Sequence, residues 1–600
     1  MKCRFTFLIF FLIVFMAVSA ASQTTIHSPY LRNPDNAIGY VDSCAQFWLN
    51  TWDESSGGFY TNINKYGNVI TGYGTNKNML TQARNAYGLV RAFMLTGDTT
   101  YLSLAGKALN FMYQHAWDLN YGGWYQELDK NGNALYPFSD KTAFYQHYAM
   151  LGIMAYYEAT GDTTAWNWLM KSYDHLEARF WDSRPAYSGY YDATNYLGGN
   201  PYNKSFNATV DAVTTHLLYL YLLTEDPAYK SRLEEMAREI IDHLAASMPA
   251  QAMGFVEHYD SNWNWDNSET MTIMGHVLKS GWCLARIYQN DPDTSYISTA
   301  KKLIGNVWEK GYDHEFGGPY KDFNRVTGEM LLWGLPDTAK AWWQMEQAVT
   351  AGLQMFDITA DSLYLRMADE SLDFFMNYFV DRQYGEVYSD RTRYGKMAWN
   401  EDKGNGGKAG YHSIELGYYA YLYGKLFVKN EPAILHYYFF PSPEQREILL
   451  TPLAIKDTEL EIRSVYREGQ NYANFDSRNR MLTLPAGTGG HFVVTFGRVP
   501  ATIIAGRDNP VLPESMELYQ NYPNPFNPTT TIGFMLPKPG FVTLKIYDVL
   551  GKEVATLVSG RLATGEYEYQ WNAGKLASGI YYYRLQSDNI AQTRKLILLK

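Results

Sequence analysis

The sequence predicts a mainly α-helical fold, an (α/α)6 barrel of six helical hairpins, followed by small all-β domains that include a C-terminal immunoglobulin-like module. Two observations predict the barrel. A glycine-containing loop recurs six times at a spacing of about 65 residues, and the segments between these loops carry apolar residues three and four positions apart. A third observation predicts the β-rich end, because beyond residue 430 the pattern changes to short alternating runs bounded by turn residues.

Each repeat begins with a glycine that is followed by apolar or aromatic residues. The marker glycines are Gly58, Gly123, Gly189, Gly254, Gly318 and Gly385. An Asp about 40 residues later precedes a helix-forming run and predicts a helix N-cap. These residues are Asp98, Asp162, Asp226, Asp291 and Asp361. Six hairpins that each need a neighbour are expected to close into a ring, with all six glycine loops at one end, rather than to form an open superhelix.

The two ends of the chain carry export features. Residues 1–22 combine Lys2 and Arg4 with an apolar run that ends in small residues, which predicts a secretory signal that is too short for a stable membrane span. No later stretch is long and apolar enough to span. The predicted domains are a signal peptide over 1–22, the catalytic barrel over 23–430, a small β-domain over 431–500, a linker over 501–513 and a second β-module over 514–600.

Composition excludes several classes of function. The net charge of −11 offers no basic patch for nucleic acid. The three cysteines include no CxxC pair, so neither a structural zinc site nor a disulfide framework is expected. Aromatic residues make up 16% of the chain, which is compatible with sugar binding because rings stack on sugar faces.

Polar residues at comparable distances from the repeat glycines predict a site at one mouth of the barrel. They are Arg84, His147, His216, His276, Glu346 and His412, each about 22 to 28 residues after its glycine. A pocket lined by rings and a few polar groups is expected there. Imidazoles have a pKa near 6.5 and can accept or donate a proton at neutral pH. Two imidazoles on opposite faces of an enediolate could therefore epimerise a sugar at C2, or isomerise an aldose to a ketose.

Other functions remain open at this point. A glycoside hydrolase or lyase would need two carboxylates beside the scissile bond, and Glu257, Asp260, Asp266 and Glu269 are candidates. A zinc site lacks an HExxH motif, and a serine nucleophile lacks Gly-x-Ser-x-Gly. A non-catalytic glycan-binding barrel is the remaining alternative.

Several strings in the barrel resemble the N-acylglucosamine 2-epimerase superfamily, which includes cellobiose 2-epimerases and aldose–ketose isomerases. The most specific are Trp342-Trp343-Gln344-Met345-Glu346 and Lys408-Ala409-Gly410-Tyr411-His412, and Gly275-His276 also matches. The resemblance implies a reducing mono- or oligosaccharide as substrate, with no metal and no cofactor in the chemistry. It implies His276 and His412 as the acid/base pair, supported by His216. The residues expected to bind substrate are Arg84, Tyr145, Trp343, Glu346, Glu257 and Lys279.

One of these residues departs from the family pattern. Family members commonly carry Glu three residues after the Gly-His histidine, where this chain has Lys279. An ammonium one helical turn from His276 disfavours an imidazolium there. We therefore expect His276 to begin as the base and His412 as the acid.

The C-terminal module resembles the sorting domain of type IX secretion substrates. The resemblance rests on the strings at 518–528, Tyr547-Asp548-Val549-Leu550-Gly551 and Ala577-Ser578-Gly579-Ile580-Tyr581. It implies passage through the periplasm and a secreted or cell-surface location, with the type IX machinery as the partner of residues 514–600. A generic immunoglobulin-like stalk is the alternative.

Overall fold

The computed structural model describes residues 26–499 and 516–599, except 453–454, 456–459, 522, 538–539, 563–564, 575 and 588–589. The predicted export signal and the linker at 501–513 lie outside the described residues. No described helix combines the length and the apolar character that crossing a membrane requires.

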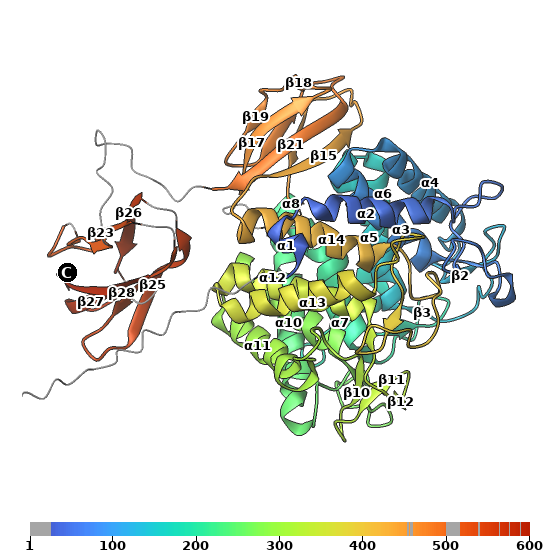
Figure 1. The fold of residues 1–600 in the computed structure, drawn as a ribbon, viewed down its shortest axis with the longest axis horizontal. Helices are drawn as coiled ribbons and strands as arrows, with labels where there is room; N and C mark the ends of the chain where they lie inside the picture. The colour runs from blue at the N-terminus through green and yellow to red at the C-terminus, as the bar shows by residue number, and fades with distance from the viewer. Residues whose placement is uncertain are drawn as a thin grey trace, which may run out of the picture.

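Six inner helical segments form a closed ring, which Figure 1 shows from the side. Each contacts the next, and the last, α14, contacts the first, α3. The ring confirms the predicted (α/α)6 barrel and excludes the open superhelix. The third segment consists of α7 and α8 joined by a π-helical turn at Val213–Leu217. The inner segments are α3 (Met79–Thr96), α5 (Ala143–Thr160), α7 (Phe206–Ala212) with α8 (Leu218–Thr224), α10 (Met274–Asn290), α12 (Trp342–Thr359) and α14 (Tyr411–Tyr423).

Six outer helices cover this ring. They are α2 (Asn36–Leu49), α4 (Thr99–His115), α6 (Thr163–Phe180), α9 (Pro227–Glu239), α11 (Thr294–Asn306) and α13 (Ser362–Tyr378). The sixth hairpin differs from the prediction, because no outer helix follows α14 in the described part of the chain. Helix α2 from the N-terminal side packs against α14 instead, so the two ends of the barrel sequence close the ring together.

The predicted Asp caps hold at four of the five outer helices that follow them. Each cap carboxylate accepts a hydrogen bond from a backbone N–H of the first helical turn, which satisfies a donor that has no partner within the helix. The prediction for Asp291 was wrong. That residue ends α10, and Asp293 caps α11 two positions later.

Buried Asp–Lys pairs fix the glycine loops at one end of the ring. In five of the six repeats an Asp just before the marker glycine pairs with a Lys that precedes the inner helix, at 2.7 to 3.2 Å. The pairs are Asp53–Lys77, Asp118–Lys141, Asp182–Lys204, Asp313–Lys340 and Asp381–Lys403. Each Lys also donates to a loop carbonyl. In the fourth repeat, Thr272 and Ser247 hydroxyls accept from the loop backbone instead.

The opposite end of the ring is closed. Buried charged and aromatic side chains fill the axis there, including the Arg91–Glu158 ion pair at 2.7 Å and a Tyr87 hydroxyl that donates to Glu415 at 2.7 Å. A small β-domain packs against α3 and α5 at this end. Its sheets have the orders β15-β21-β17-β18 and β16-β20-β19. Its longer strands are β15 (Ala433–Phe439), β16 (Arg446–Leu449), β17 (Leu460–Arg467), β20 (Met481–Leu484) and β21 (Gly490–Arg498).

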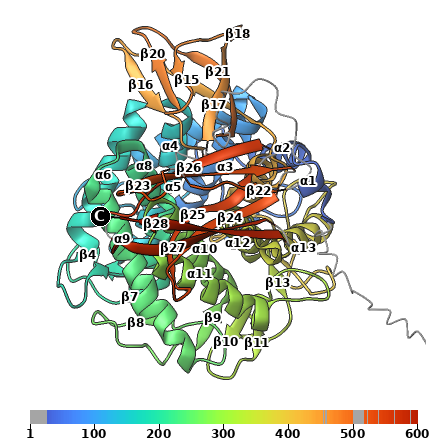
Figure 2. The same cartoon turned by 90° about the vertical axis from the view of Figure 1, so that its left-hand side faces the viewer.

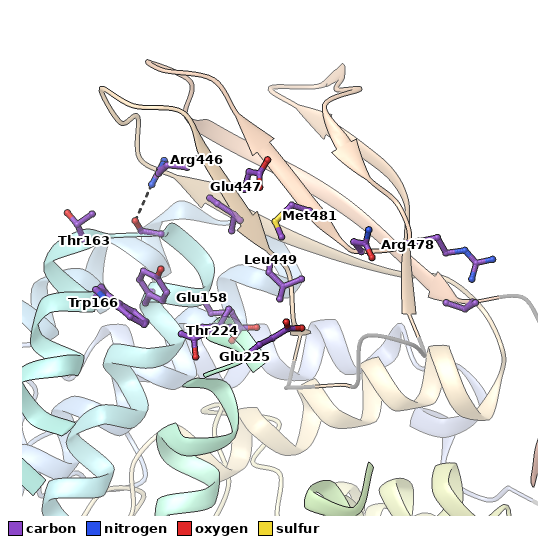
Figure 3. A pocket seen from close by; sticks show the side chains of 16 residues that line it. Glu158, Thr163, Trp166, Thr224, Glu225, Arg446, Glu447, Leu449, Arg478 and Met481 are labelled. Carbon is purple, nitrogen blue, oxygen red and sulfur yellow. Dashed lines mark hydrogen bonds between the residues drawn. The ribbon is translucent and has the colours of Figure 1, made fainter. Parts of the chain in front are cut away.

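A cavity of about 980 Å³ lies between the β-domain and the barrel (Figure 3). Trp166 lines it from the barrel, and Arg446 and Met481 line it from strands β16 and β20. The Arg446 guanidinium donates to the Gly161 carbonyl and ties the two parts together. None of the residues predicted to be functional lines this cavity.

The C-terminal module is an antiparallel two-sheet structure with its own core (Figure 2). Its sheets have the orders β22-β23-β26 and β25-β24-β27-β28. Phe534, Leu544 and Tyr583 are fully buried in its core. The strands are β22 (Glu517–Leu518), β23 (Thr529–Leu536), β24 (Gly540–Tyr547), β25 (Glu553–Leu562), β26 (Gly565–Asn572), β27 (Gly579–Ser587) and β28 (Ile590–Leu598).

Candidate active site

A cavity of about 460 Å³ opens at the N-terminal ends of the inner helices. Nine of the residues that line it share a helical register. They occupy the second or sixth position of an inner helix, and positions four apart share one side of a helix. The second positions supply Phe144, Asn207, Trp343 and His412, and the sixth positions supply Arg84, Tyr148, Asp211, Lys279 and Gln347.

Two histidines lie beside the Trp343 ring in this cavity. The centroid of the ring lies 5.2 Å from that of His276 and 6.0 Å from that of His412. His276 occupies the third position of α10, and the Phe206 ring stacks on it at 3.8 Å. The structure therefore brings together two imidazoles that are 136 residues apart in the sequence.

Each of these imidazoles is oriented by a carboxyl group behind it. Nδ1 of His276 lies 2.7 Å from Oε2 of Glu257, and Nδ1 of His412 lies 3.2 Å from Oε2 of Glu346. With Nδ1 engaged, Nε2 is the ring nitrogen left for a substrate in both histidines. Glu346 accepts further hydrogen bonds from Thr350 and Gln347, which fix its carboxyl group.

Burial and the charges around the cavity act on His412. Burial, followed by the positive charges of Arg84, Lys279 and Lys408, lowers the pKa of His412 well below its usual value. This environment favours the neutral form of His412, which runs against the expectation that it begins as the acid. Lys279, expected to act on His276, is instead among the cations that disfavour an imidazolium at His412.

The ammonium of Lys279 is held by Asp211 at the sixth position of the neighbouring inner segment. Nζ lies 2.5 Å from Oδ1 of Asp211 and 3.3 Å from the Tyr148 hydroxyl. Burial opposes the charge, but the attraction of Asp211 outweighs it and raises the pKa of Lys279. The Arg84 guanidinium lies 4.5 Å from the centre of the Tyr148 ring and donates to the Gly407 carbonyl.

Residues 58–415, which include this entire ring of side chains, match the N-acylglucosamine 2-epimerase (GlcNAc 2-epimerase) family model. The chain belongs to the N-acylglucosamine 2-epimerase family. A cellobiose 2-epimerase of Bacteroides fragilis is 22% identical over 61% of this chain and 93% of its own length. A D-mannose isomerase of Marinomonas mediterranea is 22% identical over 63% of this chain and 94% of its own length.

Solved structures of the family share the fold. The cellobiose 2-epimerase of Spirochaeta thermophila aligns with a TM-score of 0.57 at 22% identity, covering 66% of this chain and 98% of its own. A D-mannose isomerase structure aligns with a TM-score of 0.58 at 20% identity, covering 66% of this chain and 99% of its own.

Residues 520–599 match the secretion system C-terminal sorting domain. This epimerase-family chain therefore carries an export address behind its barrel, and its location is secreted or at the cell surface.

His216, a predicted site residue, lies outside the cavity lining. It is fully buried, and it stacks against His147 at 5.5 Å and against Tyr173 of the outer helix α6 at 5.8 Å. Distance from the loop glycine misplaced it, because the loops differ in length. His216 and His412 both follow their glycines by 27 residues, but His216 lies ten residues past the start of its inner segment and His412 only one.

Three further predicted substrate contacts also lie off the cavity wall. Glu257 and Glu346 stand behind the two histidines, as described above. Tyr145 occupies the third position of α5, and its hydroxyl accepts from Asn78 outside the cavity. The structure thus places Arg84, Trp343, Lys279, His276 and His412 on the cavity wall and the other four predicted residues away from it.

Several residues that line the cavity were missed or were quoted only within a string. Asp211, Tyr148 and Gln347 occupy the sixth helical positions, so counting from the first residue of each inner helix would have found them. Trp333 has no such signal, because it lies between strands β11 (Met330–Leu332) and β12 (Leu335–Pro336), an extension of the fifth loop.

The carboxylates are poorly placed for a glycosidase. Among the described residues that line the cavity, Asp211 is the one acidic side chain, whereas a glycosidase mechanism needs two. Asp260 is exposed and Asp266 is half-buried, and both accept hydrogen bonds from their own turns.

One cluster in the described part of the chain has metal-ligating side chains close together, namely Glu346, His412 and Glu415. Thr350, Gln347 and Tyr87 already donate to the two carboxyl groups. Burial and the repulsion of Glu415 raise the pKa of Glu346, so the cluster favours a proton on this carboxyl group.

Proposed function

We propose that the barrel catalyses proton transfer at C2 of a reducing sugar, giving the C2 epimer or the corresponding ketose. The observation that carries the proposal is the pair His276 and His412, which lie beside the Trp343 ring with each Nδ1 engaged by a carboxyl group. This arrangement leaves two Nε2 atoms for a substrate held between them.

In the proposed mechanism His412 is the base. Its lowered pKa favours the neutral ring, and an Nδ1–H that donates to Glu346 leaves Nε2 without a proton, so Nε2 can take the proton from C2 of the open-chain sugar. His276, whose Nδ1 is held 2.7 Å from Oε2 of Glu257, is the acid that supplies the second proton. Return of a proton to C2 from the other face inverts that carbon. Delivery of a proton to C1, with transfer of the O2 proton to O1, gives the ketose.

The enediolate formed between these steps carries negative charge. Arg84 and Lys279 supply cations on the cavity wall, and the N-terminal ends of the inner helices direct their positive dipole ends at the same space. Trp342 and Trp343 offer ring faces for the sugar. The similarity to proteins named cellobiose 2-epimerase and D-mannose isomerase supports these two reactions.

Incubation of the purified protein with cellobiose, D-glucose and D-mannose tests this function. The proposal predicts a C2 epimer or a ketose from at least one of the three sugars, without cleavage of the glycosidic bond. Release of glucose from cellobiose would support the hydrolase instead, and binding without any conversion would support the glycan-binding barrel.

We further propose that the C-terminal module delivers the enzyme to the type IX secretion machinery. The module has its own hydrophobic core, separate from that of the barrel, so its removal should leave the barrel folded. Deletion of residues 514–600 is expected to retain activity while leaving the protein in the periplasm. Export of the truncated protein would contradict this role.

A further inference from the structure

An ion pair on the cavity wall contains a carboxylate oxygen that accepts no hydrogen bond from the described residues. Oδ1 of Asp211 accepts from Lys279, but Oδ2 has no hydrogen-bond partner among the described residues. Asp211 is 1% exposed and lines the cavity. A buried carboxylate oxygen without a partner costs free energy, so its persistence points to a ligand group that completes it.

The ammonium of the same ion pair also has one N–H donor left for a ligand. An ammonium has three N–H donors, and Lys279 uses two of them on Asp211 and the Tyr148 hydroxyl. Lys279 is 3% exposed and lines the same cavity. The pair therefore presents one acceptor and one donor side by side.

We infer that Lys279 and Asp211 form a clamp for one hydroxyl group of the sugar. A hydroxyl can accept from the Lys279 ammonium and donate to Oδ2 of Asp211 at once. A carboxylate or phosphate would meet the Asp211 charge, and an amine would meet the Lys279 charge. The clamp therefore selects a neutral polyol, which deepens and rests on the proposed function.

The clamp lies one helical turn deeper than the acid. Lys279 follows His276 by three residues on α10, and Asp211 follows Phe206, which stacks on His276, by five residues on α7. A hydroxyl held by the pair fixes the sugar relative to both imidazoles. Lys279 and Asp211 are thus substrate-positioning residues, and the replacement of the family's usual Glu by Lys279 is matched by a carboxylate on the neighbouring segment.

The test removes both charges together, because loss of one partner would leave a buried charge unpaired. The variant is Lys279→Gln/Asp211→Asn. The matched control is Lys141→Gln/Asp118→Asn, which removes an equally buried pair at 2.7 Å that does not line the cavity. The dissociation constants of D-glucose, D-mannose, cellobiose and the 3-, 4- and 6-deoxy derivatives of D-glucose are measured by NMR titration, which does not require turnover.

The clamp predicts an affinity loss of about 10- to 100-fold for the first variant and none for the control. The deoxyglucose that lacks the clamped hydroxyl should bind the unmodified protein as weakly as D-glucose binds the variant. Its affinity should not fall further in the variant. Unchanged affinity in the first variant, or equal loss in the control, would overturn the clamp. Binding by the unmodified protein without conversion would overturn the proposed function but leave the clamp standing, and failure of all three sugars to bind would overturn both.

Discussion

The barrel wall contains two pairs of histidines that differ in their surroundings. His276 and His412 line the cavity, lie beside Trp343 and have a carboxyl group at Nδ1. His147 and His216 stack on each other at 5.5 Å, are fully buried, and lie outside the cavity lining. The comparison teaches that position within the helix and a carboxyl partner, rather than residue type or distance from the loop glycine, distinguish a histidine on the cavity wall from a packed one.

The largest effect on catalysis is expected when either histidine of the first pair is replaced. His276→Ala and His412→Ala should each lower kcat by about 10² to 10⁴, because each removes a general acid or base. Sugar binding, measured by NMR titration, should change far less. Near-normal turnover in both variants would remove the basis for separating the two pairs.

The carboxyl partners can be tested separately from the histidines. Glu257→Gln keeps a hydrogen-bonding group at Nδ1 of His276 but removes the carboxyl group that engages this nitrogen. We expect kcat to fall by roughly 10²-fold, the scale of a misplaced or wrongly protonated catalytic group, with KM little changed. A KM change without a kcat change would indicate that Glu257 binds substrate directly.

The pH profile tests the assignment of the base. Burial and the cations Arg84, Lys279 and Lys408 lower the pKa of His412, so the base stays neutral as the pH falls through 6.5. The acid limb of kcat/KM should therefore begin below pH 6.5 and then steepen to about tenfold per pH unit. An acid limb centred at or above pH 6.5 would show that His412 is not the base.

The smallest effect on catalysis is expected in the second pair. His216→Phe and His147→Phe should leave kcat within about threefold, because neither ring lines the cavity. Burial lowers the pKa of His147 to about 4, below its value in the unfolded chain. The unfolded state thus binds more protons between pH 6.5 and 4, and stability falls as the pH drops through this range, by up to about 3 kcal/mol.

His147→Phe should therefore flatten the loss of stability between pH 6.5 and 4, as measured by urea unfolding. His216→Phe, whose imidazole also has a lowered pKa through burial, should act in the same direction. An unchanged pH dependence of stability in both variants would show that these histidines do not carry the acid sensitivity.

The sequence alone was sufficient to predict the ring, because six glycine loops and helical apolar spacing leave few other ways to bury the hydrophobic faces. It also placed His276, His412, Arg84, Trp343 and Lys279 near the mouth. It failed for His216, because loop lengths vary and a count from the glycine does not follow the helical turn.

The unpredicted features depend on contacts between distant segments. The packing of α2 against α14 joins the start and end of the barrel sequence. The ion pair between Lys279 and Asp211 joins residues 68 positions apart. The prediction about the effect of Lys279 on His276 considered only residues on the same helix and therefore missed this partner. The spacing of residues in the sequence identifies individual candidate residues, but it does not predict which of them are in contact.

The central claim, that His276 and His412 move the C2 proton, is tested most directly in deuterated water. The purified barrel is incubated with a sugar that it converts, and NMR follows deuterium at C1 and C2 in the unmodified protein and in His276→Ala. The account predicts solvent deuterium in the product of the unmodified enzyme. It predicts that His276→Ala, which retains the base His412, exchanges C2 of the substrate without completing the reaction. Conversion with full retention of the C2 proton in the unmodified protein would contradict it.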